Sequence, residues 1–576
     1  MAKAGKAGAW VRLGGWVALG LLWALLSSLR PGQAFVPPPA PTLTPDLAAF
    51  PLVTTYDLGQ TTLAQQGVAA EFETMPLPLT GAIAHPPGAA PVPWVVVLHG
   101  RHGGCHFQPE ATSQWPCPPG TETRFDLGFA YLAQALAEAG YGVLIPNLNG
   151  AFSETYGATA DNRNELADQR SGQILDAHLS RLALAHRGEE VGFGRSLTGR
   201  VDLGRLALVG HSMGGGAAAL SALRRGAAPA ASATGLGPMA ALVLVSPTRS
   251  YALGQRPDAS QLPDLPTVVL AGGCDRDIFD LSSLYYLETA RHQPRQTPAL
   301  GLLLPGANHN YFNAAVAEDD YYRQPDNAPL CNPQRSRQRL SRVAQEDFLR
   351  QYVPAFLGTV WSDPAEAALA EVALAPNRAA PARLFGQPVR TTLVMPTAQR
   401  RTVFAAQPLD SHNTPHNGPQ PVLSDGLTAS FCPALSDCEP ARPYPQFPAL
   451  LTVGWQTPTE WLRIPLSDDI SRFASLELRL VPDPAWAVPP QQPAFAVVLR
   501  DGQGRAARVE IPATVPALGQ FEADPVAGAT APLYASALRI PLGQFGGIDL
   551  AAVTQVELVF DQAPQGRLHL ASIEFV

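Results

Sequence analysis

Lysine is almost missing from this sequence. Lys3 and Lys6 are the only lysines among its 576 residues, and every other cationic side chain is an arginine. Beyond residue 6 the chain therefore has no lysine for a Ser-Lys dyad, a Schiff base or pyridoxal chemistry. A reactive serine in this chain needs another base to activate it.

Basic residues are outnumbered by acidic ones, which gives a formal net charge of −8. Residues 1–34 resemble a secretory signal, with a basic start, an apolar run over Leu13–Leu29 and a small-residue cleavage site that ends at Ala34. The alternative is an uncleaved membrane anchor, the one case in which we expect contact with a membrane. Cleavage would remove four basic residues and no acidic one, which leaves a net charge of −12. So acidic a chain is a poor partner for nucleic acid.

Cysteine is sparse, with six residues, and no C-x-x-C pair occurs, so a zinc site is disfavoured. None precedes Cys105, which excludes a lipid-anchored export signal. In an exported chain these cysteines indicate disulfides, and the last pair follows from the other two by elimination. The expected pairs are Cys105–Cys117, Cys432–Cys438 and Cys274–Cys331.

The length exceeds that of one ordinary core, so we expect more than one domain. After the signal, the expected segments are a Pro-rich linker at 35–50, a first domain at 51–360, a linker at 361–390 and a second domain at 391–576.

The first domain alternates short apolar runs with helical patterns, which predicts an α/β fold built on a parallel sheet. The ligand site of such a sheet lies at the carboxyl ends of its strands. The expected strands are Trp94–Leu98, Tyr141–Pro146, Leu206–Val209, Ala241–Ser246, Thr267–Ala271 and Ala299–Leu304. The expected helices are Phe125–Ala139, Arg170–His186, Ala217–Leu223 and Arg337–Leu357.

The second domain has short strands separated by Gly, Pro and Asp turns, without a long helical pattern, which predicts an antiparallel β-sandwich. The expected strands are Trp461–Pro465, Ser475–Val481, Ala494–Arg500, Ala506–Ile511, Ala537–Pro541, Gln555–Phe560 and Arg567–Phe575.

One strand runs directly into Gly210-His211-Ser212-Met213-Gly214, the pattern of a nucleophile elbow. The short motif alone is also compatible with an ordinary Gly-rich turn. The apolar strand before it and the small-residue helix after it favour the elbow, with Ser212 as the nucleophile.

An acid and a base follow the next suitable strands in the order this architecture uses. Asp275 is our candidate acid because it comes first after its strand, with Asp277 and Asp280 as alternatives. His309, after the following strand, is the candidate base. These residue types fit because a serine hydroxyl attacks only when a base takes its proton, and the base needs an acid to orient it.

Acyl transfer also needs donors for the oxyanion, and we expect the N–H groups of Met213 and Arg101, with His102 as the alternative to Arg101. Another interpretation of His99, His102 and His106 is a metal cluster, but no carboxylate motif completes it. We expect no metal or organic cofactor, and nothing indicates a structural Ca²⁺ in the second domain.

Residues 75–357 resemble the α/β-hydrolase superfamily, since the Gly-His-Ser-Met-Gly-Gly elbow, Asp275, the Gly-Ala-Asn-His segment at His309 and the His99-Gly100 loop stand in its order. They are similar to secreted polyester hydrolases, cutinase-like enzymes and platelet-activating-factor acetylhydrolase relatives. The resemblance implies an α/β-hydrolase sheet flanked by helices and a serine carboxylic-ester hydrolase without cofactor.

Residues 391–576 resemble a galactose-binding-like jelly roll, as found in carbohydrate-binding modules, through two Arg-Ile-Pro-Leu segments, Leu499–Gly504 and the last strand. The resemblance implies a C-terminal all-β domain that binds a glycan or cell-surface polymer. Trp455, Trp461 and Tyr534 would stack on a sugar or, more commonly, belong to the core.

Two inserts depart from compact polyesterases, one at Cys105–Cys117 and one at Asn147–Arg205, and each is either a lid or cleft wall or a surface decoration. We therefore expect a secreted or cell-envelope esterase acting on small or polymeric esters. The alternatives are a catalytically idle surface protein that binds glycans, and a peptidase or other acyl hydrolase with the same triad.

Overall fold

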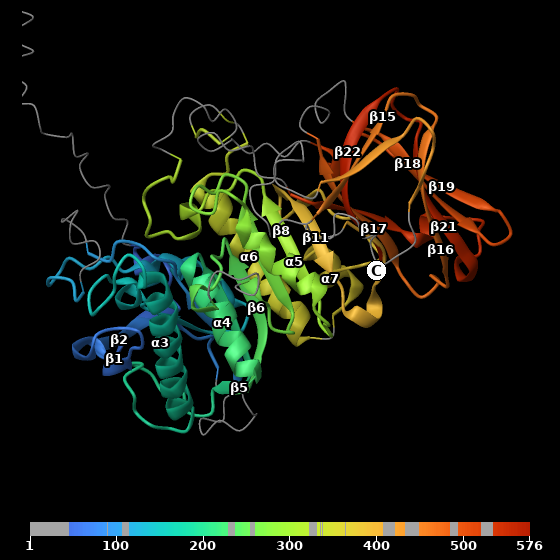
Figure 1. The fold of residues 1–576 in the computed structure, drawn as a ribbon. Coiled ribbons are helices and arrows are strands. Elements are labelled where there is room, and N and C mark those ends of the chain that lie inside the picture. Colours follow the sequence, from blue (N-terminus) through green and yellow to red (C-terminus); the bar gives the residue numbers. More distant parts are fainter. Residues whose placement is uncertain are drawn as a thin grey trace, which may run out of the picture. The chain divides into compact units, whose positions relative to one another are not determined.

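The computed structural model places the largest sheet of the chain between residues 53 and 394 (Figure 1). All described residues from Thr42 onward belong to one compact unit, Thr42–Val576. The structure describes residues 45–88, 90–105, 115–227, 237–253, 260–321, 331–333, 336, 338–362, 364–406, 421–432, 449–483, 493–519 and 534–576.

Nine strands form this sheet in the order β1-β2-β4-β3-β5-β6-β7-β8-β11. The six from β4 to β8 run parallel, whereas β1, β2 and β11 pair antiparallel at the two edges. Their bounds are β1 Val53–Ala64, β2 Thr74–Ala84, β3 Val92–Leu98, β4 Gly142–Pro146, β5 Val201–His211, β6 Met239–Val245, β7 Thr267–Gly272, β8 Ala299–Leu304 and β11 Arg390–Val394.

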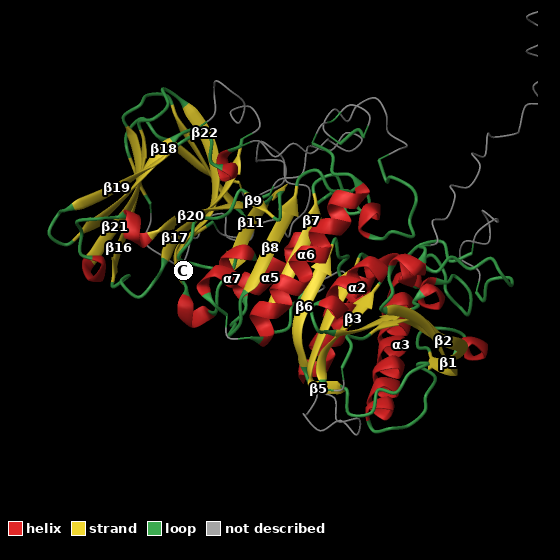
Figure 2. Cartoon of the chain, turned by 180° about the vertical axis from the view of Figure 1, so that it is seen from behind, coloured by secondary structure: helices red, strands yellow, loops and turns green. Residues whose placement is uncertain are grey.

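Helices pack on both faces of the parallel strands, which is why those strands are apolar on both sides. On β3, Val95 and Val97 face one core cluster and Val96 faces the other, as alternation along a strand requires. The first face carries α2 (Ala130–Glu138) and α6 (Arg342–Trp361) (Figure 2), and the second carries α3 (Arg163–His186), α4 (Met213–Ala227) and α5 (Tyr285–His292) (Figure 1). The short helix α7 (Glu366–Glu371) follows α6.

The later residues form two antiparallel sheets around a third hydrophobic core. One sheet contains β12 (Arg401–Ala405), β14 (Thr428–Cys432), β15 (Leu450–Trp455), β17 (Ser475–Pro482), β20 (Ser536–Pro541) and β22 (Gly566–Phe575). The other contains β13 (Val422–Leu423), β16 (Glu460–Asp468), β18 (Phe495–Asp501), β19 (Ala506–Ile511) and β21 (Val553–Phe560). A two-stranded pair, β9 (Arg383–Leu384) and β10 (Gln387–Pro388), precedes them.

This architecture overturns the predicted fold class. We expected an α/β-hydrolase sheet flanked by helices plus a C-terminal jelly roll, but the large sheet is mixed and several further sheets are antiparallel, so that strand exceeds helix. The expectation failed at the two edges of this sheet, where the β1–β2 hairpin and β11 add antiparallel strands that the sequence patterns did not predict. The domain boundaries proposed above stay predictions.

No helix in the described ranges has both the length and the apolar character that crossing a membrane requires. The proposed signal segment, including its apolar run Leu13–Leu29, lies outside the described residues, as does most of the Pro-rich linker at 35–50.

Candidate active site

The parallel strands of the large sheet have their carboxyl ends at the same end of the sheet. The three candidate triad residues each come after one of these strands. The parallel register aligns Leu98 of β3 with Gly210 of β5, and Gly272 of β7 with Leu304 of β8. Ser212 comes two residues after Gly210, Asp275 follows β7 and His309 follows β8. Residues far apart in the sequence therefore reach the same end of the sheet.

Ser212 occupies a strained turn between β5 and α4. Its φ of 55° lies in the left-handed region, which a non-glycine residue rarely adopts. Around it the backbone is so closely packed that a Cβ on Gly214 would lie 2.4 Å from the main-chain oxygen of His99. The side chain of Ser212 is only 7% exposed. This is the geometry of an elbow that holds a serine at the sheet edge.

The loop after β3 lies directly against the serine. A Cβ on Gly100 would be 2.5 Å from the Cβ of Ser212 and 3.1 Å from its Oγ, so only glycine fits there. His99 shapes this loop: its Nδ1 donates to the main-chain oxygen of Gly100 at 2.8 Å, and its Nε2 accepts the N–H of Leu148 at 2.7 Å. Both ring nitrogens of His99 are thus engaged, which removes it from the alternative metal cluster.

Arg101 belongs to the same loop, and an ion pair holds its side chain in place. Its guanidinium donates to Glu154 Oε1 at 2.6 Å, and Arg163 donates to the same oxygen at 2.6 Å. No hydrogen bond of the described residues uses the N–H of Arg101. Met213 begins α4, so its N–H has no acceptor within the helix. Met213 follows Ser212 directly, and Arg101 follows Gly100, which lies against Ser212; their role as oxyanion donors stays a prediction.

The alternative donor, His102, packs its ring against Phe125 with 4.6 Å between centroids. Its Nε2 is buried and has no partner among the described residues. Burial, helped by the nearby His99 and His309, lowers the pKa of His102 to about 3. His102 is therefore neutral, and His106, the third member of the alternative metal cluster, lies outside the described residues.

Asp275 is the carboxylate that contacts the base. Its Oδ2 accepts from Nδ1 of His309 at 2.8 Å, and both side chains are buried. Its Oδ1 accepts the N–H groups of Asp277 and Ile278 at 3.0 and 2.7 Å. The alternative Asp280 accepts instead from Ser282 in its own loop.

The other alternative acid, Asp277, lies near the opposite ring nitrogen. Its Oδ2 is 3.7 Å from Nε2 of His309, and its side chain is 62% exposed. No hydrogen bond joins Ser212 Oγ to His309 Nε2 among those of the described residues, and such bonds are often long in free enzymes. The ring of His211 connects the turn that carries Ser212 to the loop that carries His309. Its centroid is 4.8 Å from that of the His309 ring, and its Nε2 donates to the main-chain oxygen of His309 at 3.1 Å.

The protonation of His309 follows from its surroundings. Burial alone would lower its pKa, but the charge and hydrogen bond of Asp275, with the charges of Asp277 and Asp320, outweigh burial and raise the pKa to about 9. The neighbouring His211 shows the opposite behaviour, because burial and then the charge of His309 lower its pKa well below 6.5. The surroundings thus favour the charged form of His309 and the neutral form of His211.

Two of the three predicted disulfides are present, Cys105–Cys117 and Cys274–Cys331. The second joins the loop of Asp275 to the segment that follows His309. The Cys432–Cys438 pair lies outside the residues whose side chains the structure describes.

Sequence analysis missed three residues that contact this site: His211, Glu154 and Asp320. His211 stands inside the elbow motif, so its position pointed to the site, although its bond to His309 did not. For Glu154 and Asp320 no sequence signal exists, because their partners come from distant loops.

Two of the three aromatic residues considered for sugar stacking belong to the core. Trp455 is fully buried and stacks on Phe560 with 4.5 Å between centroids, and Tyr534 is 5% exposed. One face of the partly buried Trp461 ring is covered by Arg463, whose guanidinium carbon lies 3.5 Å from the ring centroid. Trp455 and Tyr534 therefore offer no open face to a sugar.

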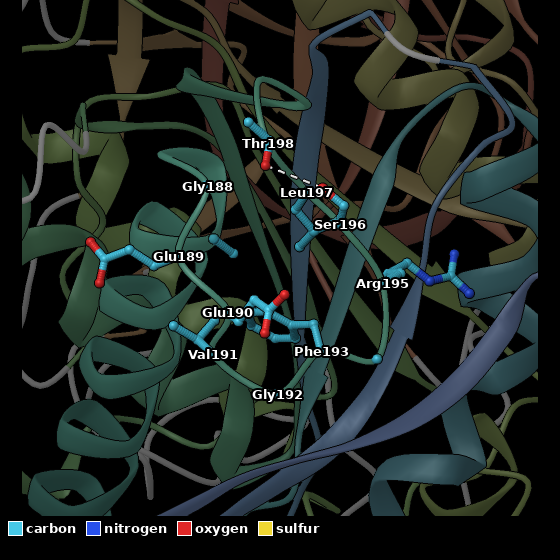
Figure 3. A pocket seen from close by; sticks show the side chains of 12 residues that line it. Gly188, Glu189, Glu190, Val191, Gly192, Phe193, Arg195, Ser196, Leu197 and Thr198 are labelled. Carbon is cyan, nitrogen blue, oxygen red and sulfur yellow. Dashed lines mark hydrogen bonds between the residues drawn. The ribbon is translucent and has the colours of Figure 1, made fainter.

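A separate hollow of about 410 Å³ lies in the loop between α3 and β5 (Figure 3). Its lining is Ala185 and residues 188–198, so no member of the candidate triad takes part. The close-up shows Ser196 and Thr198 joined by a hydrogen bond across the loop, 3.1 Å between their oxygens, while Glu189 points away from it. The hollow is thus formed largely within one loop, apart from the candidate triad.

No protein-family model matches the sequence, and a search of curated proteins found no match either. Within the described ranges no group of three His, Cys, Asp or Glu side chains is arranged to hold a metal ion. The geometry of the site is therefore the basis for any functional conclusion.

Proposed function

We propose that this chain is a serine hydrolase that cleaves carboxylic esters through an acyl-enzyme. The observation that carries the proposal is the buried 2.8 Å bond between Asp275 Oδ2 and His309 Nδ1. It occurs together with a serine, Ser212, whose φ of 55° lies in the left-handed region. A carboxylate that binds Nδ1 holds the proton there and leaves Nε2 as the base. Few structural roles require this combination.

In the proposed reaction, Ser212 Oγ attacks the ester carbonyl while His309 Nε2 takes the hydroxyl proton. The imidazolium that forms is stabilised by Asp275, and it then protonates the leaving alcohol. The N–H groups of Met213 and Arg101 bind the oxyanion of the tetrahedral intermediate. Water, deprotonated by His309, releases the acid and restores Ser212.

We further propose that the protein works outside the cytosol. The supporting observation is the pair of disulfides, Cys105–Cys117 and Cys274–Cys331, which persist in oxidising compartments. An extracellular ester, small or polymeric, is then the expected substrate.

The proposal is tested with a fluorophosphonate probe. The purified chain is expected to be labelled once, and mass spectrometry of its peptides is expected to place the adduct on Ser212. Denatured protein serves as the control, because only the folded triad activates a serine. The labelled protein should lose its hydrolysis of a short-chain chromogenic ester in proportion to labelling.

Other outcomes point to the alternatives. Failure of the folded protein to react, together with retention on a glycan or cell-wall polymer, would favour an idle binding protein. Labelling at Ser212 with faster cleavage of amides than of esters in a matched panel would favour a peptidase.

The pH dependence gives a second prediction. His309 accepts a proton only when it is neutral, and its pKa of about 9 means that it is protonated at lower pH. We therefore expect kcat/KM for a stable ester to rise about tenfold per pH unit well below pH 9, and about 50-fold between pH 7 and pH 9. A rate that is already constant by pH 7 would show that the carboxylates do not hold the proton on His309 in this way.

A further inference from the structure

A second carboxylate, Asp320, connects the two loops that carry the acid and the base. Its Oδ2 accepts the N–H of Arg276 at 2.8 Å and the N–H of His309 at 3.1 Å. Its Oδ1 accepts the N–H of Asn310 at 3.4 Å. One side chain thus binds the residue after Asp275 and the base itself through their main chains.

Nearer to the strands, the two loops are also joined by main-chain bonds, from the N–H of Gly273 to the oxygen of Leu304 and from the N–H of Cys274 to the oxygen of Ala307, both 2.8 Å. The loops leave different strands, β7 and β8, and the Cys274–Cys331 disulfide joins the acid loop only to a segment 22 residues beyond His309. Beyond Cys274, the bonds from Arg276 and His309 to Asp320 add to the triad bond in holding the two loops at their spacing. Charge-assisted bonds from main-chain N–H groups to a carboxylate are among the stronger hydrogen bonds in proteins.

We propose that Asp320 is a positioning residue of the proposed triad: its carboxylate holds the Asp275 loop and the His309 loop together and adds a negative charge beside the imidazole. The expected effect of Asp320 on the reaction rate rests on the proposed ester hydrolysis, whereas its role in holding the two loops together does not. Asp320 does not touch the reacting atoms, since its contacts are with main-chain N–H groups.

The charged groups around Asp320 come from both loops. Asp275 and His309 act on it directly, and Asp277 acts with it on His309. Burial, followed by the charge of Asp275, raises the pKa of Asp320 to about 6 against the effect of His309 and the N–H donors. Asp320 is thus ionised between pH 7 and pH 9, where the hydrolysis would be measured.

The test replaces Asp320→Asn and compares it with Glu318→Gln. Both substitutions remove one negative charge from the same loop, but Glu318 is exposed and only its main-chain oxygen forms a bond here. In Asp320→Asn one of the carboxylate acceptors becomes an NH₂ group that faces N–H donors. We expect kcat to fall about 10- to 100-fold with KM for a short-chain ester unchanged, and Glu318→Gln to keep its kcat.

A second readout does not depend on turnover. In protein labelled on its histidine rings, NMR titration is expected to show the pKa of His309 about one unit lower in Asp320→Asn than in wild type, and unchanged in Glu318→Gln. If wild type neither labels nor hydrolyses esters, the proposed function fails while this titration still decides the role of Asp320. The same His309 pKa in all three proteins, or equal kcat in both variants, would overturn the role of Asp320.

Discussion

Ser212→Ala is expected to lower kcat for a short-chain ester by about 10⁶-fold and to abolish labelling by a fluorophosphonate. The reason is that no other group in the site forms the acyl-enzyme, while the oxyanion donors beside it stay in place. A residual rate above that in water is expected from these donors and from substrate binding alone. The measurement is kcat by stopped or continuous assay with protein purified from a host lacking secreted esterases.

Ser221→Ala is the matched control for this substitution. Ser221 lies in α4, the helix that begins next to Ser212, and both serines are 7% exposed. The two changes each remove one hydroxyl of equal burial, nine positions apart in the chain, so a large difference between them reflects chemistry rather than folding. Ser212→Ala protein with activity within tenfold of wild type would contradict the proposed mechanism.

The sequence predicted the candidate site better than the fold class. Each candidate triad residue stands just after an apolar strand, and the ends of parallel strands meet at one sheet edge, so local patterns sufficed to place Ser212, Asp275 and His309 together. The choice of Asp275 over Asp277 rested on its position directly after the strand. The structure brings Asp275 to Nδ1 of His309 and Asp277 to the vicinity of Nε2.

The antiparallel strands of the large sheet, β1, β2 and β11, had no comparable local signal. β2 contains Pro76 and Pro78, which argue against a strand in a sequence. In the structure both prolines lie in the part of β2 that pairs only with β1, because β4 pairs with Gly81–Ala84, and a strand with one free side tolerates proline. β11 is placed by its pairing with β8 across about ninety residues of intervening chain, which no local pattern reveals.

The contacts that organise the site were also beyond the sequence. The role of Gly100 depends on the approach of two loops to within van der Waals distance, and the role of Glu154 depends on an ion pair across 53 residues. Such features follow from tertiary packing, in which one residue type serves many purposes. Order and spacing are therefore enough to name candidate triad residues, whereas their supporting contacts can be found only in the structure.

Asp275→Asn is expected to have the second largest effect, a fall of about 10⁴-fold in kcat. The N–H groups of Asp277 and Ile278 bind Oδ1 at 3.0 and 2.7 Å, so in the variant the amide oxygen keeps that position. The NH₂ group must then replace Oδ2 and face Nδ1 of His309. Because it donates, it selects the tautomer with the proton on Nε2, which cannot accept the proton of the serine.

Asp277→Asn separates this role from that of a nearby charge. The carboxylate of Asp277 lies 3.7 Å from Nε2 and is 62% exposed, so its loss leaves the Nδ1 bond intact. We expect this variant to retain kcat within about tenfold and to reach its maximal rate at a lower pH, since one of the charges that raise the pKa of His309 is gone. Comparison of pH–rate profiles for the two variants measures both effects. The reverse order, with Asp277→Asn nearly inactive and Asp275→Asn active, would make Asp277 the acid of the triad, which would require a His309 ring turned to present the other nitrogen to Ser212.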